Sequence, residues 1–302
     1  MFRLIAEPKE RNVMSDRLMS DRLLRLPRLF LVLSLPLALG ACVNIGALSG
    51  RGTQGNPNIA EIQTDNPAVA AANIDSLNEV VKNNPRDPVA YNTRGAALAK
   101  TAQFKEAIAD FSQAVALNPN FAEAYTNRGL ALRQTGRNDQ ALTDFNTAIQ
   151  ANPNYDGAYL ARANLYRSLN RFDEALADLN FAIRLKPESA QFVHARGLIY
   201  QRQGLWQQAI NDFDAAIDRN PFVAAPYLAR GQCLTQVNKL DSALEDFNAA
   251  LNINNRNADA WAGLGLVSEK MGNKAKALEA YNSAIGIDPN QAIARAGLNR
   301  MR

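Results

Sequence analysis

Small and apolar residues recur along this chain at an interval of 34 residues, from Pro88 toward the C-terminal end. Counting Pro88 as position 1 of a repeat, positions 20 and 27 hold only alanine: Ala107, Ala141, Ala175, Ala209, Ala243 and Ala277, then Ala114, Ala148, Ala182, Ala216, Ala250 and Ala284. Position 24 holds a large apolar residue: Phe111, Phe145, Leu179, Phe213, Phe247 or Tyr281. A period of this length indicates stacked structural repeats.

The apolar positions within one repeat predict two helices, over residues 89–100 and 105–117. Small residues such as Gly95 leave little bulk where the two helices cross, and Phe111 fills the space between neighbouring pairs. Pro119 lacks a backbone N–H and restricts the residue before it, so it ends the second helix. Because one pair cannot bury its apolar face alone, we expect the pairs to stack.

These columns resemble the tetratricopeptide repeat family, with an aromatic residue at position 4, Gly at 8, Ala at 20 and 27, an aromatic residue at 24 and Pro at 32. The resemblance implies an all-α solenoid, a right-handed superhelix of antiparallel helix pairs. Six full repeats are expected at residues 88–121, 122–155, 156–189, 190–223, 224–257 and 258–291. Val193, Ala163 and Asn255 depart from the aromatic, Gly and Pro columns, and Asn255 is expected to loosen the junction between the fifth and sixth copies.

Both ends of the array have a predicted cap. Residues 67–87 match the second helix of a repeat and form an N-terminal capping half repeat. Residues 292–302 form a C-terminal capping helix, with Arg295, Arg300 and Arg302 expected on its outer side. Such caps are needed because a terminal repeat would otherwise expose its apolar face.

Charged residues at positions 7 and 23 occur together or not at all. Five copies pair Arg94 with Asp110, Arg128 with Asp144, Arg162 with Asp178, Arg196 with Asp212, and Arg230 with Asp246. The sixth copy has Leu264 and Ala280 instead. We predict structural ion pairs within each copy, because pairing to the next copy would leave Asp246 facing Leu264.

The first 41 residues look like an export signal. A basic region is followed by the apolar run Leu29–Leu39, which is too short to span a bilayer as a helix. The sequence Leu39-Gly40-Ala41-Cys42 resembles the bacterial lipoprotein signal. That resemblance implies removal of residues 1–41, covalent diacylglycerol and an acyl chain on Cys42, and membrane attachment through this anchor. MSDRL occurs at Met14 and at Met19, so Met1, Met14 and Met19 remain alternative start sites.

Residues 42–66 are rich in Gly, Asn and Ser, which predicts a lipidated flexible tether. Val43 after the lipidated cysteine matches the enterobacterial rule for delivery to the outer membrane. The expected location is the bacterial cell envelope, as an outer membrane lipoprotein facing the periplasm.

Charge and composition argue against several classes of function. The chain has a net charge of +4, of which residues 1–41 carry +3, so no basic surface for nucleic acid is expected on the mature part. There is one histidine, His194, and no metal-binding, nucleophile or phosphate-loop motif. We therefore expect neither catalysis nor a metal, and no cofactor besides the lipid. Cys233 is interpreted as a small apolar residue.

In this family the first helices line the concave face, which implies a binding groove at positions 2, 5, 9, 12 and 13. The candidate groove residues are Asn92, Lys100, Leu130, Arg133, Leu160, Asn164, Arg167, His194, Leu198, Gln201, Arg202 and Gln232. The family's known carboxylate-binding set is absent, with only Asn164 matching one column. The groove is expected to be more acidic near Asp259 and Glu269.

We predict that Arg133, Arg167 and Arg202 face an acidic segment of a partner protein, with Leu130, Leu160 and Leu198 giving apolar contact. The alternative is that these arginines only keep the surface soluble.

The architecture broadly resembles tetratricopeptide lipoproteins of the NlpI type, which bind cell-wall hydrolases and an envelope protease. This implies a lipid-anchored scaffold or adaptor for proteins or peptides of the envelope. The alternative is an assembly factor for an outer-membrane complex, pilotin-like or acting in β-barrel assembly. Partner identity, homodimer formation and binding by the convex face remain open.

Overall fold

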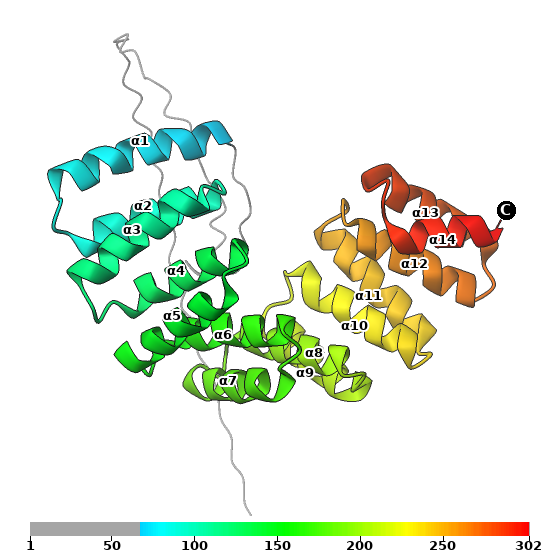
Figure 1. The fold of residues 1–302 in the computed structure, drawn as a ribbon. Helices are drawn as coiled ribbons and strands as arrows, with labels where there is room; N and C mark the ends of the chain where they lie inside the picture. Colours follow the sequence, from blue (N-terminus) through cyan, green and yellow to red (C-terminus); the bar gives the residue numbers. More distant parts are fainter. Residues whose placement is uncertain (1–66, 302) are drawn as a thin grey trace, which may run out of the picture. The chain divides into compact units, whose positions relative to one another are not determined.

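The computed structural model describes residues 67–301, so the predicted signal at 1–41 and the tether at 42–66 lie outside the described residues. All regular structure in the described range is helical (Figure 1). The helices are α1 (Pro67–Asn83), α2 (Pro88–Lys100), α3 (Phe104–Leu117), α4 (Ala122–Gln134), α5 (Asn138–Ala151), α6 (Asp156–Ser168), α7 (Phe172–Leu185), α8 (Ala190–Arg202), α9 (Trp206–Arg219), α10 (Ala224–Gln236), α11 (Leu240–Ile253), α12 (Ala258–Lys270), α13 (Lys274–Ile287) and α14 (Ala292–Met301).

The helices stack in chain order as antiparallel pairs, which confirms the predicted all-α solenoid (Figure 1). Each copy has a first helix (α2, α4, α6, α8, α10 or α12) and a second helix that packs against it. Neighbouring first helices also contact one another, whereas neighbouring second helices from α3 to α13 do not. The first helices therefore lie on the inner side of the stack.

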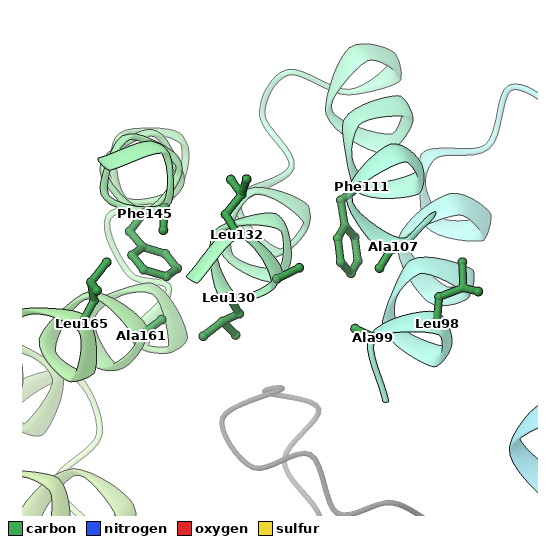
Figure 2. Packing of buried hydrophobic residues seen from close by; sticks show 11 residues of the cluster. Leu98, Ala99, Ala107, Phe111, Leu130, Leu132, Phe145, Ala161 and Leu165 are labelled. Carbon is green, nitrogen blue, oxygen red and sulfur yellow. The ribbon is translucent and has the colours of Figure 1, made fainter. Parts of the chain in front are cut away.

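Glycine at position 8 allows the aromatic ring at position 24 to lie directly on the first helix. A Cβ atom added to Gly129 would lie 2.5 Å from Cε1 of Phe145, which is fully buried. Figure 2 shows Phe111 and Phe145 each pointing into the space between helices. The third copy combines Ala163 with Leu179 in one buried cluster. In this copy the methyl group of Ala163 takes up space at position 8, and the residue at position 24, Leu179, is correspondingly smaller than phenylalanine.

A residue in the left-handed backbone region joins the two helices of every copy. These residues share position 15, and their φ angles lie between 57° and 78°: Ala102, Gly136, Asn170, Gly204, Asn238 and Gly272. Glycine and asparagine adopt this conformation at low cost, whereas alanine is strained there. The column was not recognised in the sequence, although its Gly and Asn content is the expected signal.

The junction between the fifth and sixth copies keeps the geometry of the others despite the missing proline. Asn254, which precedes Asn255, has φ −139° and ψ 94°, close to φ −134° and ψ 94° at Asn118, which precedes a proline. The Asn254 side chain accepts a hydrogen bond from the Arg256 backbone N–H at 3.1 Å. Trp261 Nε1 donates to the Asn255 carbonyl at 2.9 Å. The turn geometry and its hydrogen bonds thus match those of the proline-containing junctions, and the expected loosening stays a prediction.

The C-terminal helix α14 caps the last copy through a charged contact as well as apolar packing. Arg300 donates to both carboxylate oxygens of Glu269, at 2.8 Å and 2.7 Å. Tyr281 Oη donates to Glu269 Oε2 at 2.6 Å. The bond from Arg300 is the main cause that lowers the pKa of Glu269, to about 2. Arg300 thus compensates the charge of Glu269, which weakens the acidic character that the sequence predicted for the groove near Asp259 and Glu269.

Candidate functional site: two sets of arginines on the first helices

The first helices carry two sets of arginines with opposite surroundings. The arginine ladder consists of the position-7 residues Arg94, Arg128, Arg162, Arg196 and Arg230. The arginine row consists of Arg133, Arg167 and Arg202, which lie in the last turns of α4, α6 and α8. Helix C-termini favour cations at such positions, which is the local reason for arginine there.

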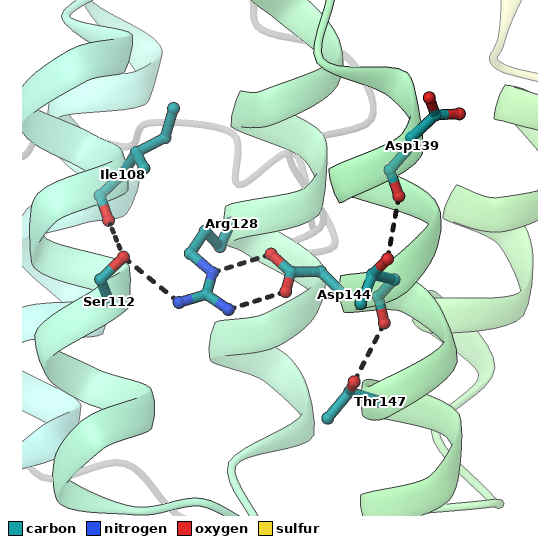
Figure 3. A network of polar contacts seen from close by, with 7 residues as sticks. Ile108, Ser112, Arg128, Asp139, Asp144 and Thr147 are labelled. Atoms are coloured by element: carbon teal, nitrogen blue, oxygen red, sulfur yellow. Dashed lines mark hydrogen bonds and ion pairs between the residues drawn. The ribbon is translucent and has the colours of Figure 1, made fainter.

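Each ladder arginine binds the aspartate of its own copy through two hydrogen bonds. Arg128 Nε donates to Asp144 Oδ2 at 2.8 Å, and Nη2 donates to Oδ1 at 2.7 Å (Figure 3). The five aspartates, which are only 4–7% exposed, are Asp110, Asp144, Asp178, Asp212 and Asp246. The hydrogen bond to Asp144 is the largest cause that raises the pKa of Arg128.

The ladder arginines make a third contact that sequence reasoning missed. Their Nη1 atoms donate to position 25 of the preceding second helix, at 2.6–3.2 Å, where the acceptors are Asn78, Ser112, Asn146, Asn180 and Asp214. The small polar residues at position 25 were the available signal. Each ladder arginine thus links three helices, and each of its three nitrogen atoms donates a hydrogen bond.

The arginine row, in contrast, has no carboxylate partner within residues 67–301. Arg133 and Arg167 are half-buried and make neither an ion pair nor a hydrogen bond to a described residue, and Arg167 Nε is fully buried without a partner. Arg202 is exposed, and its Nη2 donates only to Asn170 Oδ1, at 3.4 Å. These guanidinium groups therefore have donors to spare.

The electrostatics of the row show that its charges are uncompensated. Burial, and then the charge of Arg167, lower the pKa of Arg133, and burial and the charge of Arg202 lower the pKa of Arg167. Burial and the charge of Arg167 lower the pKa of His194 to about 4, so this imidazole is neutral near pH 7. The structure thus brings His194 and the row together, as neighbouring groups that would each gain from an anion.

Three other candidate groove residues are almost completely buried. Leu130 and Leu160 are 3% and 2% exposed and belong to the core. Asn92 is 5% exposed, donates to Glu123 at 3.4 Å and accepts from Asn127 at 3.0 Å. Their expected contact with a partner is not supported, because the two leucines are packed in the core and the Asn92 side chain is already hydrogen-bonded. Asn127 Oδ1 is also buried, without a donor in the described part of the chain.

The remaining candidates differ in exposure. Lys100 and Gln232 are exposed, whereas Asn164, Leu198 and Gln201 are half-buried. Leu198 packs against the core of the fourth and fifth copies. Gln201 donates to Gln232 Oε1 at 3.1 Å.

Gln201 and Gln232 also line a hollow of about 280 Å³ on the first helices α8, α10 and α12. Its other lining residues are Trp206, Thr235, Gln236, Phe247, Asp259, Gly263, Leu266 and Ile293. Trp206, Phe247 and Ile293 lie outside the first helices, so the groove positions did not predict them.

The described residues offer little for metal binding, membrane insertion or thiol chemistry. Among residues 67–301, no three or more His, Cys, Asp or Glu side chains are grouped so that they could hold a metal ion. None of the described helices has both the length and the apolar character needed to cross a bilayer. Cys233 is fully buried, and burial raises the pKa of its thiol to about 11, which fits a packing role.

Tetratricopeptide repeat models match residues 92–156 and 194–258, a TPR repeat model matches 163–204, and a further tetratricopeptide repeat model matches 258–291. Together these matches cover most of the chain. The chain belongs to the tetratricopeptide repeat family. It is therefore a scaffold for protein–protein interaction, built on a fold that is typically non-catalytic. A search of curated protein sequences found no match.

Solved structures are similar in fold. A chain of the APC/C hetero-tetramer Cut9–Hcn1 is 20% identical with a TM-score of 0.68, covering 77% of this chain and 47% of that one. PilF of Pseudomonas aeruginosa is 14% identical with a TM-score of 0.63, covering 70% and 97%. YrrB, described as a TPR protein with an unusual peptide-binding site, is 24% identical with a TM-score of 0.50, covering 63% and 97%. The chain thus spans about half the length of the Cut9–Hcn1 chain that it matches.

Proposed function

We propose that this protein is a lipid-anchored adaptor of the bacterial envelope whose arginine row binds an acidic segment of a partner protein. The observation that carries the binding role is the contrast between the two arginine sets. The ladder is fully paired, whereas half-buried Arg133 and Arg167 have no anionic partner among residues 67–301. Leaving charged groups buried and unpaired is costly, so a site of this kind is stabilised when carboxylates arrive.

A protein segment suits the row better than a small anion does. The three arginines come from three consecutive copies, so their charges are spread along the inner side of the stack. Planar guanidinium groups bind carboxylates with directed hydrogen bonds. An acidic segment running along the first helices would reach all three. The peptide-binding site described for YrrB is consistent with this use of the fold.

The envelope location rests on the leader and on Cys42, both outside the described residues. We propose that Cys42 carries the lipid and that residues 42–66 connect it to the repeats, which face the periplasm. Metabolic labelling with a palmitate analogue should label the wild-type chain, whereas a Cys42→Ala variant should stay unlabelled and leave the membrane fraction. Equal labelling of both chains would contradict the anchor.

The binding role is tested by crosslinking in cells followed by mass spectrometry. The test variant reverses all three charges of the row (Arg133→Glu, Arg167→Glu and Arg202→Glu). A matched control reverses three exposed arginines outside the first helices (Arg137→Glu, Arg184→Glu and Arg256→Glu). The proposal predicts loss of the main crosslinked partner in the test variant alone. Equal recovery from both variants would refute it and favour a purely solubilising role.

The identity of the crosslinked proteins separates the two classes of function. Recovery of soluble cell-wall hydrolases or proteases supports the adaptor. Recovery of integral β-barrels or secretins would instead indicate an assembly factor for an outer-membrane complex.

A further inference from the structure

The hollow on α8, α10 and α12 directly continues the arginine row. Gln201 lines the hollow and occupies position 12 of its copy, the position that Arg133 and Arg167 of the row occupy in theirs, and Arg202 follows it on α8. A segment that reaches Arg202 from α4 and α6 would therefore meet the hollow next, if it followed the inner side of the stack.

The volume and lining of the hollow admit an apolar side chain. Its volume of about 280 Å³ exceeds the roughly 150 Å³ of an apolar cavity that holds benzene, so a side chain of that size can enter it. Leu266, half-buried, and Ile293, 39% exposed, contribute apolar surface that no described residue covers completely. An apolar side chain placed here would lose contact with water at little polar cost.

The rim suits the backbone of a peptide. Gln232 and Gln236 are exposed at the rim. Gln236 offers amide donors and an acceptor, and Gln232 offers its amide donors, whereas Gln201 already donates to Gln232 Oε1 at 3.1 Å. A peptide backbone presents the same two kinds of group. Asp259 also lines the hollow, so carboxylates of the partner are disfavoured at this end and favoured at the row.

We propose that the hollow binds an apolar side chain of the same partner segment whose carboxylates bind the arginine row. This deepens the proposed function and rests on it. With acidic residues held over α4, α6 and α8 and an apolar residue held between α8 and α12, the segment can lie along the groove in one direction only. The hollow then acts as a specificity site, which selects among acidic segments by their apolar residue.

The spacing between the two elements follows from the repeat. Packed helices lie about 8–10 Å apart, and an extended chain advances about 3.3 Å per residue, so one copy corresponds to about three residues of the partner. The apolar residue should therefore lie about three to six residues from the nearest acidic residue.

The test selects peptides from a random display library on the full immobilised chain and on three variants. Gln236→Trp places a bulky ring at the rim of the hollow. Gln150→Trp is its matched control, with the same substitution at an exposed residue of the second helix α5, away from the groove positions. The third variant replaces each arginine of the row by glutamine. Circular dichroism verifies folding, and Gln232→Trp, also at an exposed rim residue, replaces Gln236→Trp if needed.

The proposal predicts that wild type and Gln150→Trp select peptides with an acidic cluster and an apolar residue at the stated spacing. Gln236→Trp should keep the acidic preference and lose the apolar one, with at least about tenfold weaker binding of the wild-type peptide in fluorescence anisotropy. Selection of acidic peptides without an apolar preference, or an apolar preference that survives Gln236→Trp, would overturn the hollow alone. Selection without acidic enrichment, or acidic enrichment that survives loss of the row, would overturn the proposed function and the hollow together.

Discussion

Replacing Arg128 by leucine should destabilise the second copy strongly, because it leaves the Asp144 carboxylate buried without its partner. The Asp144 side chain is 6% exposed and would lose two hydrogen bonds, of 2.8 Å and 2.7 Å. Removal of one member of a buried pair costs about 3–5 kcal/mol. The Arg128 side chain is 22% exposed, so water can partly replace it, and we expect about 3 kcal/mol, at the lower end of this range.

Replacing both partners should cost less than replacing the arginine alone. The double variant Arg128→Leu with Asp144→Ala recreates the combination of Leu264 and Ala280, with which the sixth copy folds. No buried carboxylate remains in it, so the main penalty disappears. This result would show that the repeat loses less stability when both partners of a ladder pair are replaced than when the arginine alone is replaced.

The assay is urea unfolding followed by circular dichroism, combined with hydrogen exchange of amides in α4 and α5. The second measurement is needed because copies in a repeat array can unfold separately. Glu174→Ala is the control, because the Arg171–Glu174 pair is about half exposed (45% and 46%) and should contribute less than about 1 kcal/mol. A cost for Arg128→Leu no larger than that of the control, or a double variant equal to the sum of the single variants, would refute this reasoning.

Three further predictions concern the turns, the core and the histidine. Ala102→Gly should stabilise the first copy by up to about 1 kcal/mol in urea unfolding, and Gly136→Ala should destabilise the second by a similar amount, because both residues have positive φ. If both variants were as stable as wild type, position 15 would not strain an alanine. Leu179→Phe should destabilise the third copy by about 1–3 kcal/mol, and addition of Ala163→Gly should recover most of this loss; failure of this rescue would argue against the Gly–aromatic contact. His194 has a pKa of about 4 in the folded chain and 6.5 in the unfolded chain, so between pH 7 and pH 5 only the unfolded chain takes up the proton. Over this range the free energy of unfolding should therefore fall by about 2 kcal/mol more in wild type than in a His194→Asn variant. Parallel pH profiles of the two proteins would contradict this.

The repeat architecture could be predicted from the sequence because each copy supplies an independent observation of the same position. Six alanines in one column cannot be read as an accident of local composition, and the joint loss of Arg and Asp in the sixth copy assigned the ladder pairs to helices of the same copy. The third ladder contact was missed, since position 25 varies among Asn, Ser and Asp and only the stacking brings it close to the arginine.

Surface properties were harder to predict than the fold. Leu130 and Leu160 occupy groove columns, yet they are buried, because the depth of a side chain depends on how closely neighbouring first helices pack. Glu269 occupies a groove position, but it binds Arg300, which belongs to the C-terminal cap and lies outside the repeat pattern. The hollow depends on the spacing of α8, α10 and α12 and on Ile293 of α14, and no column contains that information.

The central claim is that arginines on the same helices have two separate roles, one in stability and one in binding. Its most direct test is to measure, for two triple variants in the same cells, the melting temperature and the amount of partner crosslinked per folded molecule. One variant replaces the arginine row by glutamine, and the other replaces three ladder residues, Arg94, Arg128 and Arg162, by glutamine. The account predicts an unchanged or raised melting temperature and a lost partner for the row variant, and a clearly lowered melting temperature for the ladder variant. A row variant that retains its partner, or that melts as early as the ladder variant, would contradict it.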